Sequence, residues 1–271
     1  VLLNSENDLQ EAQIQRASIL RNFLFVASGL LLIIIAGIYY QYRFAKRSNK
    51  IISDERNRSD QILLNILPED TVAELKANGS VKAKKFDQVS VLFTDFKEFT
   101  KVAEVNTPEA LVNSIDYYFR NFDDIISRHG LEKIKTIGDA YMCAGGLPKP
   151  NSTHATDAIA AAIDLVSFVN LTKQNPPKGI LPFDIRIGIS TGPVVAGVVG
   201  TKKFQYDIWG RTVNTASRME SSSTAGRINI SASTYQMASH RYNCEYRGEV
   251  VAKHGEVLKM YFVETPVLIE Q

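Results

Sequence analysis

An uncharged apolar stretch at residues 23–40, FLFVASGLLLIIIAGIYY, constrains the fold more than any other feature of this chain. As an α-helix it would rise about 27 Å, close to the hydrocarbon thickness of a bilayer. A buried core helix or a signal peptide is the alternative, but the stretch is long for a signal sequence and no small-residue cleavage site follows it. The sequence therefore predicts one transmembrane helix at residues 23–40.

The residues on either side of this stretch indicate its orientation. Only two basic residues precede it, whereas a belt of tyrosines and four basic residues follow it: Arg16 and Arg21 before; Tyr39, Tyr40, Tyr42, Arg43, Lys46, Arg47 and Lys50 after. Because Lys and Arg gather on the cytoplasmic side of a bilayer, we expect a cell-membrane protein whose later residues are cytoplasmic. Residues 1–22 are expected to end an upstream region, with a sensor of unknown kind beyond Val1, inside a longer protein.

Residues 41–83 are predicted to form a helical linker. The segment is highly charged, and a few apolar residues near heptad positions favour a parallel coiled coil, although Glu55 interrupts that seam. Pro68 is suited to begin a second short helix, and Asn78-Gly79 is suited to end it. This second helix is either a transducer element or an inert spacer.

The remaining sequence alternates between strand and helix patterns up to residue 265, followed by a tail at 266–271. The predicted elements are a strand at 88–94, a helix at 107–129, a hairpin at 131–146, a helix at 154–172, strands at 183–190 and 193–199 around a Thr191-Gly192 turn, and a helix from Thr212. Their order predicts an α+β domain with a ferredoxin-like βαββαβ core.

Composition excludes some classes of function. The formal charge of +2 is too small to indicate a nucleic-acid partner. The two cysteines are too few for a disulfide framework and suit a reducing compartment.

Two acidic residues lie where a metal site could form. Asp95 follows the apolar run Val91-Leu92-Phe93, and Asp139 follows Gly138 at the expected hairpin turn. If the two strands pair, these carboxylates converge at one edge of a sheet, where they could hold Mg²⁺ ions bridging a polyphosphate. Two solvated turn acids remain the alternative on geometry alone.

Three motifs carry a resemblance to a known family. FTDFKEFT at 93–100, KTIGDAYM at 135–142 and YDIWGRTVNTASRME at 206–220 follow in that order. Together they resemble the catalytic domain of class III nucleotidyl cyclases over residues 84–265. The resemblance implies that Asp95, Asp139 and the Phe96 carbonyl hold two Mg²⁺ or Mn²⁺ ions. It also implies that Asn214 orients the ribose and that Arg218 stabilises charge on the α-phosphate, a task suited to a bidentate guanidinium.

The resemblance places base recognition on Lys135 and Asp207. Adenine offers an acceptor at N1 and a donor at N6, so a lysine donor and an aspartate acceptor complement it. Guanylyl-specific relatives usually carry Glu and a small residue such as Cys at these positions. We therefore expect an adenylate cyclase that converts ATP to 3′,5′-cyclic AMP and pyrophosphate. A guanylate or relaxed-specificity cyclase, or a non-catalytic receptor or scaffold, stays as an alternative.

The polyphosphate contacts depart from the family pattern. Lys253 resembles a lysine that binds terminal phosphates in some relatives, but His254-Gly255 follows where Gly-Lys is usual. Pro193 stands where some relatives have a phosphate-binding arginine, so other groups must act there. In relatives the site forms between two catalytic domains; because this chain carries both sets of residues, we expect a homodimer with two equivalent sites. A site within one chain is not excluded, since Lys135 and Asp139 lie about 13 Å apart along an extended strand.

Overall fold

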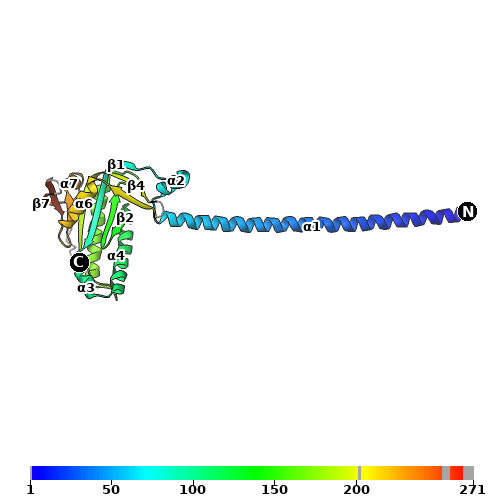
Figure 1. Ribbon diagram of the computed structural model, residues 1–271, viewed down its shortest axis with the longest axis horizontal. Helices are drawn as coiled ribbons and strands as arrows, with labels where there is room; N and C mark the ends of the chain where they lie inside the picture. Colours follow the sequence, from blue (N-terminus) through cyan, green and yellow to red (C-terminus); the bar gives the residue numbers. More distant parts are fainter. Residues whose placement is uncertain (1, 201–202, 252–256, 265–271) are drawn as a thin grey trace. The chain divides into compact units, whose positions relative to one another are not determined.

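The computed structural model describes residues 2–200, 203–251 and 257–264, with side chains described from residue 13 onward. The chain divides between Asn65 and Ile66 into two compact units, which we treat separately (Figure 1).

The first unit is one uninterrupted helix, α1 (Leu2–Leu64). It includes the predicted span, whose large apolar side chains are exposed, among them Phe23 at 67% and Ile33 at 69%. By length and composition this helix is able to cross a bilayer. One helix of the second unit, α5 (His154–Gln174), passes the same test, but more than half of it is buried, so it is a core helix.

The second unit opens with α2 (Glu69–Asn78), which begins and ends where the sequence predicts. Pro68 precedes it, and Gly79 closes it at a φ of 69°, donating its N–H to the Leu75 carbonyl at 2.8 Å. Glycine suits this left-handed position because it lacks a Cβ. Leu67 and Val72 are buried, so this end of the linker packs as part of the second unit.

The strands of the second unit form one mixed sheet in the order β2-β3-β1-β4-β6-β8-β7, with β5 also paired to β4. Its first four members give the antiparallel ferredoxin-like arrangement, with β1 between β3 and β4. The predicted α+β fold is confirmed. The strand bounds are β1 (Lys84–Phe96), β2 (Glu132–Ile137), β3 (Ala140–Gly145), β4 (Ile185–Val199), β5 (Gln205–Trp209), β6 (Ile228–Ser231), β7 (Cys244–Val251) and β8 (Val257–Val263).

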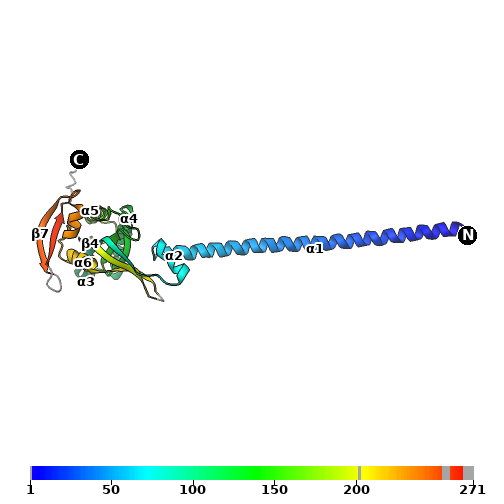
Figure 2. The ribbon, with the colours of Figure 1, turned by 90° about the horizontal axis from the view of Figure 1, so that it is seen from above.

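Helices cover both faces of this sheet (Figures 1 and 2). Side chains alternate along β4, so Ile187 and Ile189 join the core beneath α4 (Pro108–Arg128) and α5. On the other face Gly188 lies against α6 (Arg211–Ser221). The remaining described helices are α3 (Phe99–Val105), which the sequence did not predict, and α7 (Ala232–Ala238).

An aromatic cluster anchors the end of β1. Phe96 is 2% exposed, and its ring lies 4.6 Å from Phe183 and 5.2 Å from Tyr118, measured between centroids. Burying one such ring contributes about 1.5–3 kcal/mol. The backbone that carries Asp95 is therefore fixed from below by its neighbour in sequence.

The predicted turn at Thr191-Gly192 is wrong, because β4 continues through it to Val199. The Thr191 hydroxyl bonds Ser90 at 2.7 Å and Thr234 at 3.0 Å, both buried. A Cβ on Gly192 would lie 2.7 Å from the Thr212 hydroxyl, so the glycine permits close approach of α6. The Thr-Gly pair marks tight packing within a strand and not a reversal of the chain.

Candidate active site

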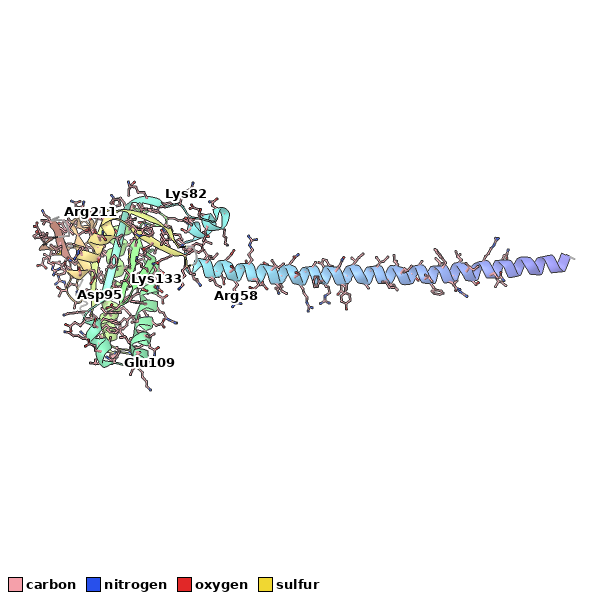
Figure 3. The ribbon with its side chains drawn as sticks, in the orientation of Figure 1. Arg58, Lys82, Asp95, Glu109, Lys133 and Arg211 are labelled. Atoms are coloured by element: carbon pink, nitrogen blue, oxygen red, sulfur yellow. The ribbon has the colours of Figure 1, made fainter. Side chains whose placement is uncertain are left out.

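The structure brings the two predicted metal carboxylates together. Asp95 lies near the end of β1, where Figure 3 labels it, and Asp139 lies in the tight turn between β2 and β3, after Gly138 with a φ of 63°. The β1–β3 ladder pairs Thr94 with Tyr141, which sets the turn beside Asp95. The pKa of Asp139 is raised, first by burial and then by the charge of Asp95 and a hydrogen bond with it.

These carboxylates fit a divalent cation. Besides burial, the charge of Asp95 raises the pKa of Asp139, so negative charge is concentrated there and a cation between the two carboxylates would relieve it. Among the described residues no group of three or more His, Cys, Asp or Glu is placed to enclose a metal. Two hard oxygen ligands with the rest left to substrate and water suit Mg²⁺ or Mn²⁺ and not zinc. The role of the Phe96 carbonyl stays a prediction.

Two residues that sequence reasoning missed complete this acidic end. Arg186 pairs in register with Asp95 across the β1–β4 ladder, and its Nη2 donates to Asp95 Oδ2. The same Nη2 lies 3.2 Å from Glu220 Oε1 on α6. The pKa of Glu220 is raised to about 7 by burial and by the charges of Asp95 and Asp139, which Arg186 opposes. We name Asp95, Asp139, Arg186 and Glu220 the acidic cluster.

The predicted base-reading pair also meets. Lys135 on β2 donates from Nζ to Asp207 Oδ2 on β5 at 2.6 Å. Asp207 is buried at 7% exposure, and its Oδ1 accepts the Ile208 N–H at 2.8 Å, which fixes the carboxylate. Lys135 is partly exposed. One donor and one acceptor therefore stand side by side, each satisfied by the other.

Helix α6 carries the two remaining predicted residues. Asn214 and Arg218 are both exposed and lie one turn apart, so they share a helical face. No ion pair or hydrogen bond joins the Arg218 guanidinium to a side chain in the described part of the chain. The opposite face is buried through Met219 and Glu220. A Cβ on Gly188 would lie 2.5 Å from Glu220 Cα, so α6 rests directly on the backbone of β4.

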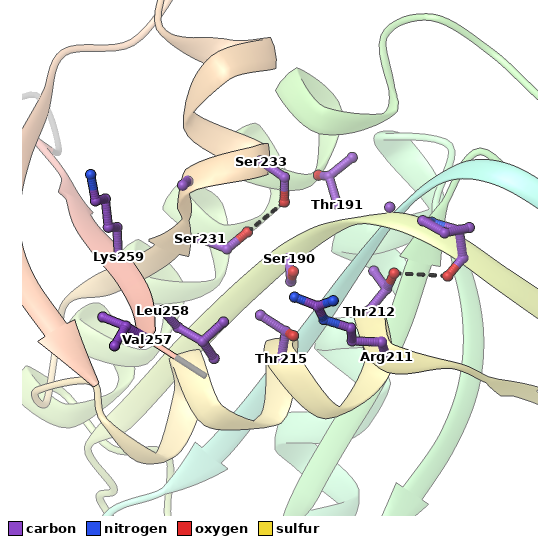
Figure 4. A pocket seen from close by; sticks show the side chains of 13 residues that line it. Ser190, Thr191, Arg211, Thr212, Thr215, Ser231, Ser233, Val257, Leu258 and Lys259 are labelled. Carbon is purple, nitrogen blue, oxygen red and sulfur yellow. Dashed lines mark hydrogen bonds between the residues drawn. The ribbon is translucent and has the colours of Figure 1, made fainter. Parts of the chain in front are cut away.

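A hollow of about 510 Å³ lies beside the first turn of α6 (Figure 4). It is bounded by β4, by the first residues of α7 and by the start of β8. Six hydroxyl side chains and two cations share it with Pro193: Ser190, Thr191, Thr212, Thr215, Ser231, Ser233, Arg211 and Lys259. Position 193 supplies no cation, but Arg211 and Lys259 line the same hollow. The predicted phosphate contact Lys253 falls outside the described residues.

Comparison with known proteins agrees with this arrangement. Residues 81–265 match the family described as adenylate and guanylate cyclase catalytic domain. The chain belongs to this family. It therefore carries a nucleotide cyclase domain, a lyase, and the paired motifs at the acidic cluster and on α6 lie within the matched residues.

Relatives of both base specificities are similar to this cyclase domain. An adenylate cyclase of Mycobacterium tuberculosis is 36% identical over 230 residues, which cover 84% of this chain and 51% of the relative. Guanylyl cyclase C of Homo sapiens is 40% identical over 197 residues, covering 72% of this chain and 18% of the relative. The chain thus spans about half the length of the mycobacterial relatives and much less of the guanylyl cyclases.

Solved structures give the same picture of the cyclase domain. The adenylyl cyclase CyaB from P. aeruginosa superposes with a TM-score of 0.64 at 29% identity, covering 70% of this chain and all of that one. The catalytic core of a rhodopsin-guanylyl cyclase with converted specificity, in complex with ATPalphaS, gives 0.64 at 34% identity, covering 68% and 98%. These structures show the cyclase fold. Because they include both adenylyl and guanylyl cyclases, the choice of base must be argued from the residues of the site.

Proposed function

We propose that this protein is a membrane-anchored adenylate cyclase that forms 3′,5′-cyclic AMP and pyrophosphate from ATP in a homodimer. The observation that carries the choice of adenine is the 2.6 Å contact between Lys135 and Asp207. A fixed acceptor beside a lysine donor complements N6 and N1 of adenine, whereas guanine presents the reverse pattern. When ATP enters, each residue would exchange its partner for the base.

The acidic cluster and α6 supply the groups for phosphoryl chemistry. Two divalent ions held by Asp95 and Asp139 would lower the pKa of the ribose 3′-hydroxyl and neutralise phosphate charge. Asn214 would accept or donate a hydrogen bond to the ribose and so orient the 3′-oxygen. Arg218 would bind the α-phosphate oxygens on which charge grows in the transition state, and its exposure leaves it open to a substrate.

Helix α1 supports anchoring in the membrane. Its apolar residues 23–40 are exposed along the helix, an area of apolar surface that a soluble helix would not keep in water. The basic residues that follow it favour a cytoplasmic catalytic domain, where ATP is available. The proposed membrane anchor is α1, which precedes the cyclase domain in the chain.

Production of cAMP and cGMP from equal ATP and GTP, with Mg²⁺ and separately with Mn²⁺, tests this function. We expect cAMP to dominate in the parent. In Lys135→Glu/Asp207→Cys we expect the ATP:GTP ratio of kcat/KM to fall at least tenfold, because misplaced buried polar groups cost about 1–3 kcal/mol each. Lys133→Glu repeats the charge change of Lys135→Glu on the same strand, where Lys133 bonds Asp123 at 2.8 Å, and should leave the ratio unchanged.

The alternatives give different results in the same assay. Dominant cGMP production by the parent would make the protein a guanylate cyclase. An unchanged ratio in the double variant would refute the base-reading role of Lys135 and Asp207. No product from either nucleotide, from protein shown to be folded, would favour a non-catalytic receptor.

A further inference from the structure

One cation already lies where a metal ion is expected. The Arg186 guanidinium stands between two carboxylates, bonded to Asp95 Oδ2 and 3.2 Å from Glu220 Oε1 through the same Nη2 atom. All three side chains are largely shielded from water, with 27%, 21% and 11% of Arg186, Asp95 and Glu220 exposed. In such surroundings the charges act strongly on one another and on any ion that enters.

The two contacts of Arg186 are unequal. The contact with Asp95 is a hydrogen bond, whereas the contact with Glu220 has the distance of an ion pair without hydrogen-bond geometry. Accordingly, Glu220 Oε1 and Arg186 Nε are buried without a hydrogen-bond partner among the described residues. Buried polar atoms left in this state are unfavourable. A small movement of the guanidinium away from Asp95 and toward Glu220 would let Glu220 Oε1, already 3.2 Å from Nη2, accept a hydrogen bond.

We propose that Arg186 is an exchangeable counter-ion: it neutralises Asp95 in the metal-free protein and shifts onto Glu220 when a divalent cation binds Asp95. The inference rests on the metal-binding role proposed above for Asp95 and Asp139. A metal bound to Asp95 would compete for the oxygen that Arg186 occupies and would repel the guanidinium. Glu220 then gives the displaced charge a buried partner, which keeps the exchange from leaving an unpaired cation.

A static salt bridge is the alternative, and metal affinity without nucleotide separates the two. We suggest measuring Mn²⁺ binding to the purified protein by the loss of the free-Mn²⁺ electron paramagnetic resonance signal. Exchange predicts that Arg186→Gln, which removes the competitor, binds Mn²⁺ at least tenfold more tightly. Glu220→Gln removes the second partner of Arg186 and should bind Mn²⁺ at least fivefold more weakly. Unchanged affinity in both variants would overturn the proposal.

The double variant Arg186→Gln/Glu220→Gln tests whether Glu220 acts only through its charge. If Glu220 acts by receiving Arg186, Glu220→Gln should change Mn²⁺ affinity less than twofold in the Arg186→Gln background. If Glu220 only attracts the metal, the same fivefold loss should appear in both backgrounds, and the exchange would be refuted. Should Arg186→Gln not fold, as judged by circular dichroism, Arg186→Lys replaces it. Lysine keeps the charge but presents one nitrogen in place of the three of the guanidinium, so coupling to Glu220 should again weaken.

Asp95→Asn shows which of the two ideas fails. Loss of Mn²⁺ binding in this variant supports the metal site, and the Arg186 and Glu220 results then decide the exchange alone. Retained Mn²⁺ binding in Asp95→Asn would overturn the metal assignment and the exchange with it.

Discussion

Replacing Gly188 by alanine should disable the cyclase while leaving its domain folded. The added Cβ would lie 2.5 Å from both Glu220 Cα and the Met219 carbonyl carbon, and ordinary contact begins at 3.4 Å. The Glu220 backbone nitrogen lies closer still to the added Cβ, and because all three are backbone atoms, α6 must retreat by about 1.5 Å at this point. Overpacking of this kind costs about 1–3 kcal/mol of stability. The same helix carries Asn214 and Arg218, and a misplacement of about 1 Å can reduce catalysis about 100-fold.

The assay is steady-state cAMP production by purified Gly188→Ala, together with urea unfolding of the same protein. We expect kcat to fall about 100-fold and the free energy of unfolding to fall by no more than about 3 kcal/mol. Gly197→Ala is the matched control. Gly197 lies on the same strand as Gly188, but its added Cβ would come no closer than 3.6 Å to any neighbouring atom, an ordinary contact. A Gly188→Ala protein with kcat within threefold of the parent would refute the idea that β4 sets the position of α6.

Further predictions concern the dimer, stability, the hollow and the linker. Asp95→Ala and Arg218→Ala chains, inactive alone, should regain activity when mixed if the site spans two chains; no recovery in proven heterodimers would indicate a site within one. Burial lowers the pKa of His154 below the ordinary 6.5, so protonation favours the unfolded state: the free energy of unfolding should fall as pH drops below 6.5, and His154→Gln should weaken this dependence in urea titrations. Arg211→Gln should raise the KM for ATP about threefold to tenfold with little change in kcat, and an unchanged KM would remove the hollow from substrate binding. One residue inserted near Ser53 rotates the following helix by about 100° and should alter activity in membranes, whereas seven should not; a flat response would make the linker a tether.

Periodicity predicted the longer helices and the ferredoxin-like core, because their apolar faces follow simple repeats. The helix at 107–129 is found as α4, with the Thr107 hydroxyl accepting the Ala110 N–H at 3.3 Å. Periodicity failed at Thr191-Gly192, where a turn-like dipeptide lies inside a long strand. The strand continues through Thr191-Gly192 because α6 packs closely against it and because buried hydroxyl groups form a chain of hydrogen bonds there. Both features depend on residues distant in sequence.

The site shows the same division. Asp95, Asp139, Lys135 and Asp207 could be identified because each lies in a motif, and the structure brings each predicted pair together. Arg186 and Glu220 were missed. Arg186 reads as the outward residue of an alternating strand, and Glu220, although it ends the third motif, reads as a charge on an amphipathic helix. Their importance comes from the crossing of β4 and α6, which no local pattern reports.

The exposure of Arg218 bears on how the two ends of the site combine. Within one chain, Arg186 already neutralises part of the negative charge of the acidic cluster, and Lys135 is paired with Asp207. Arg218, in contrast, has no partner among the described side chains. An arginine intended for a phosphate gains strength when water is removed around it, and a second chain placed over α6 would remove that water. In the proposed homodimer, twofold symmetry would make one such contact build two sites at once, each taking metal ligands from one chain and Arg218 from the other. The exposed state of Arg218 in the single chain therefore supports the proposed homodimer, in which a partner chain would cover it.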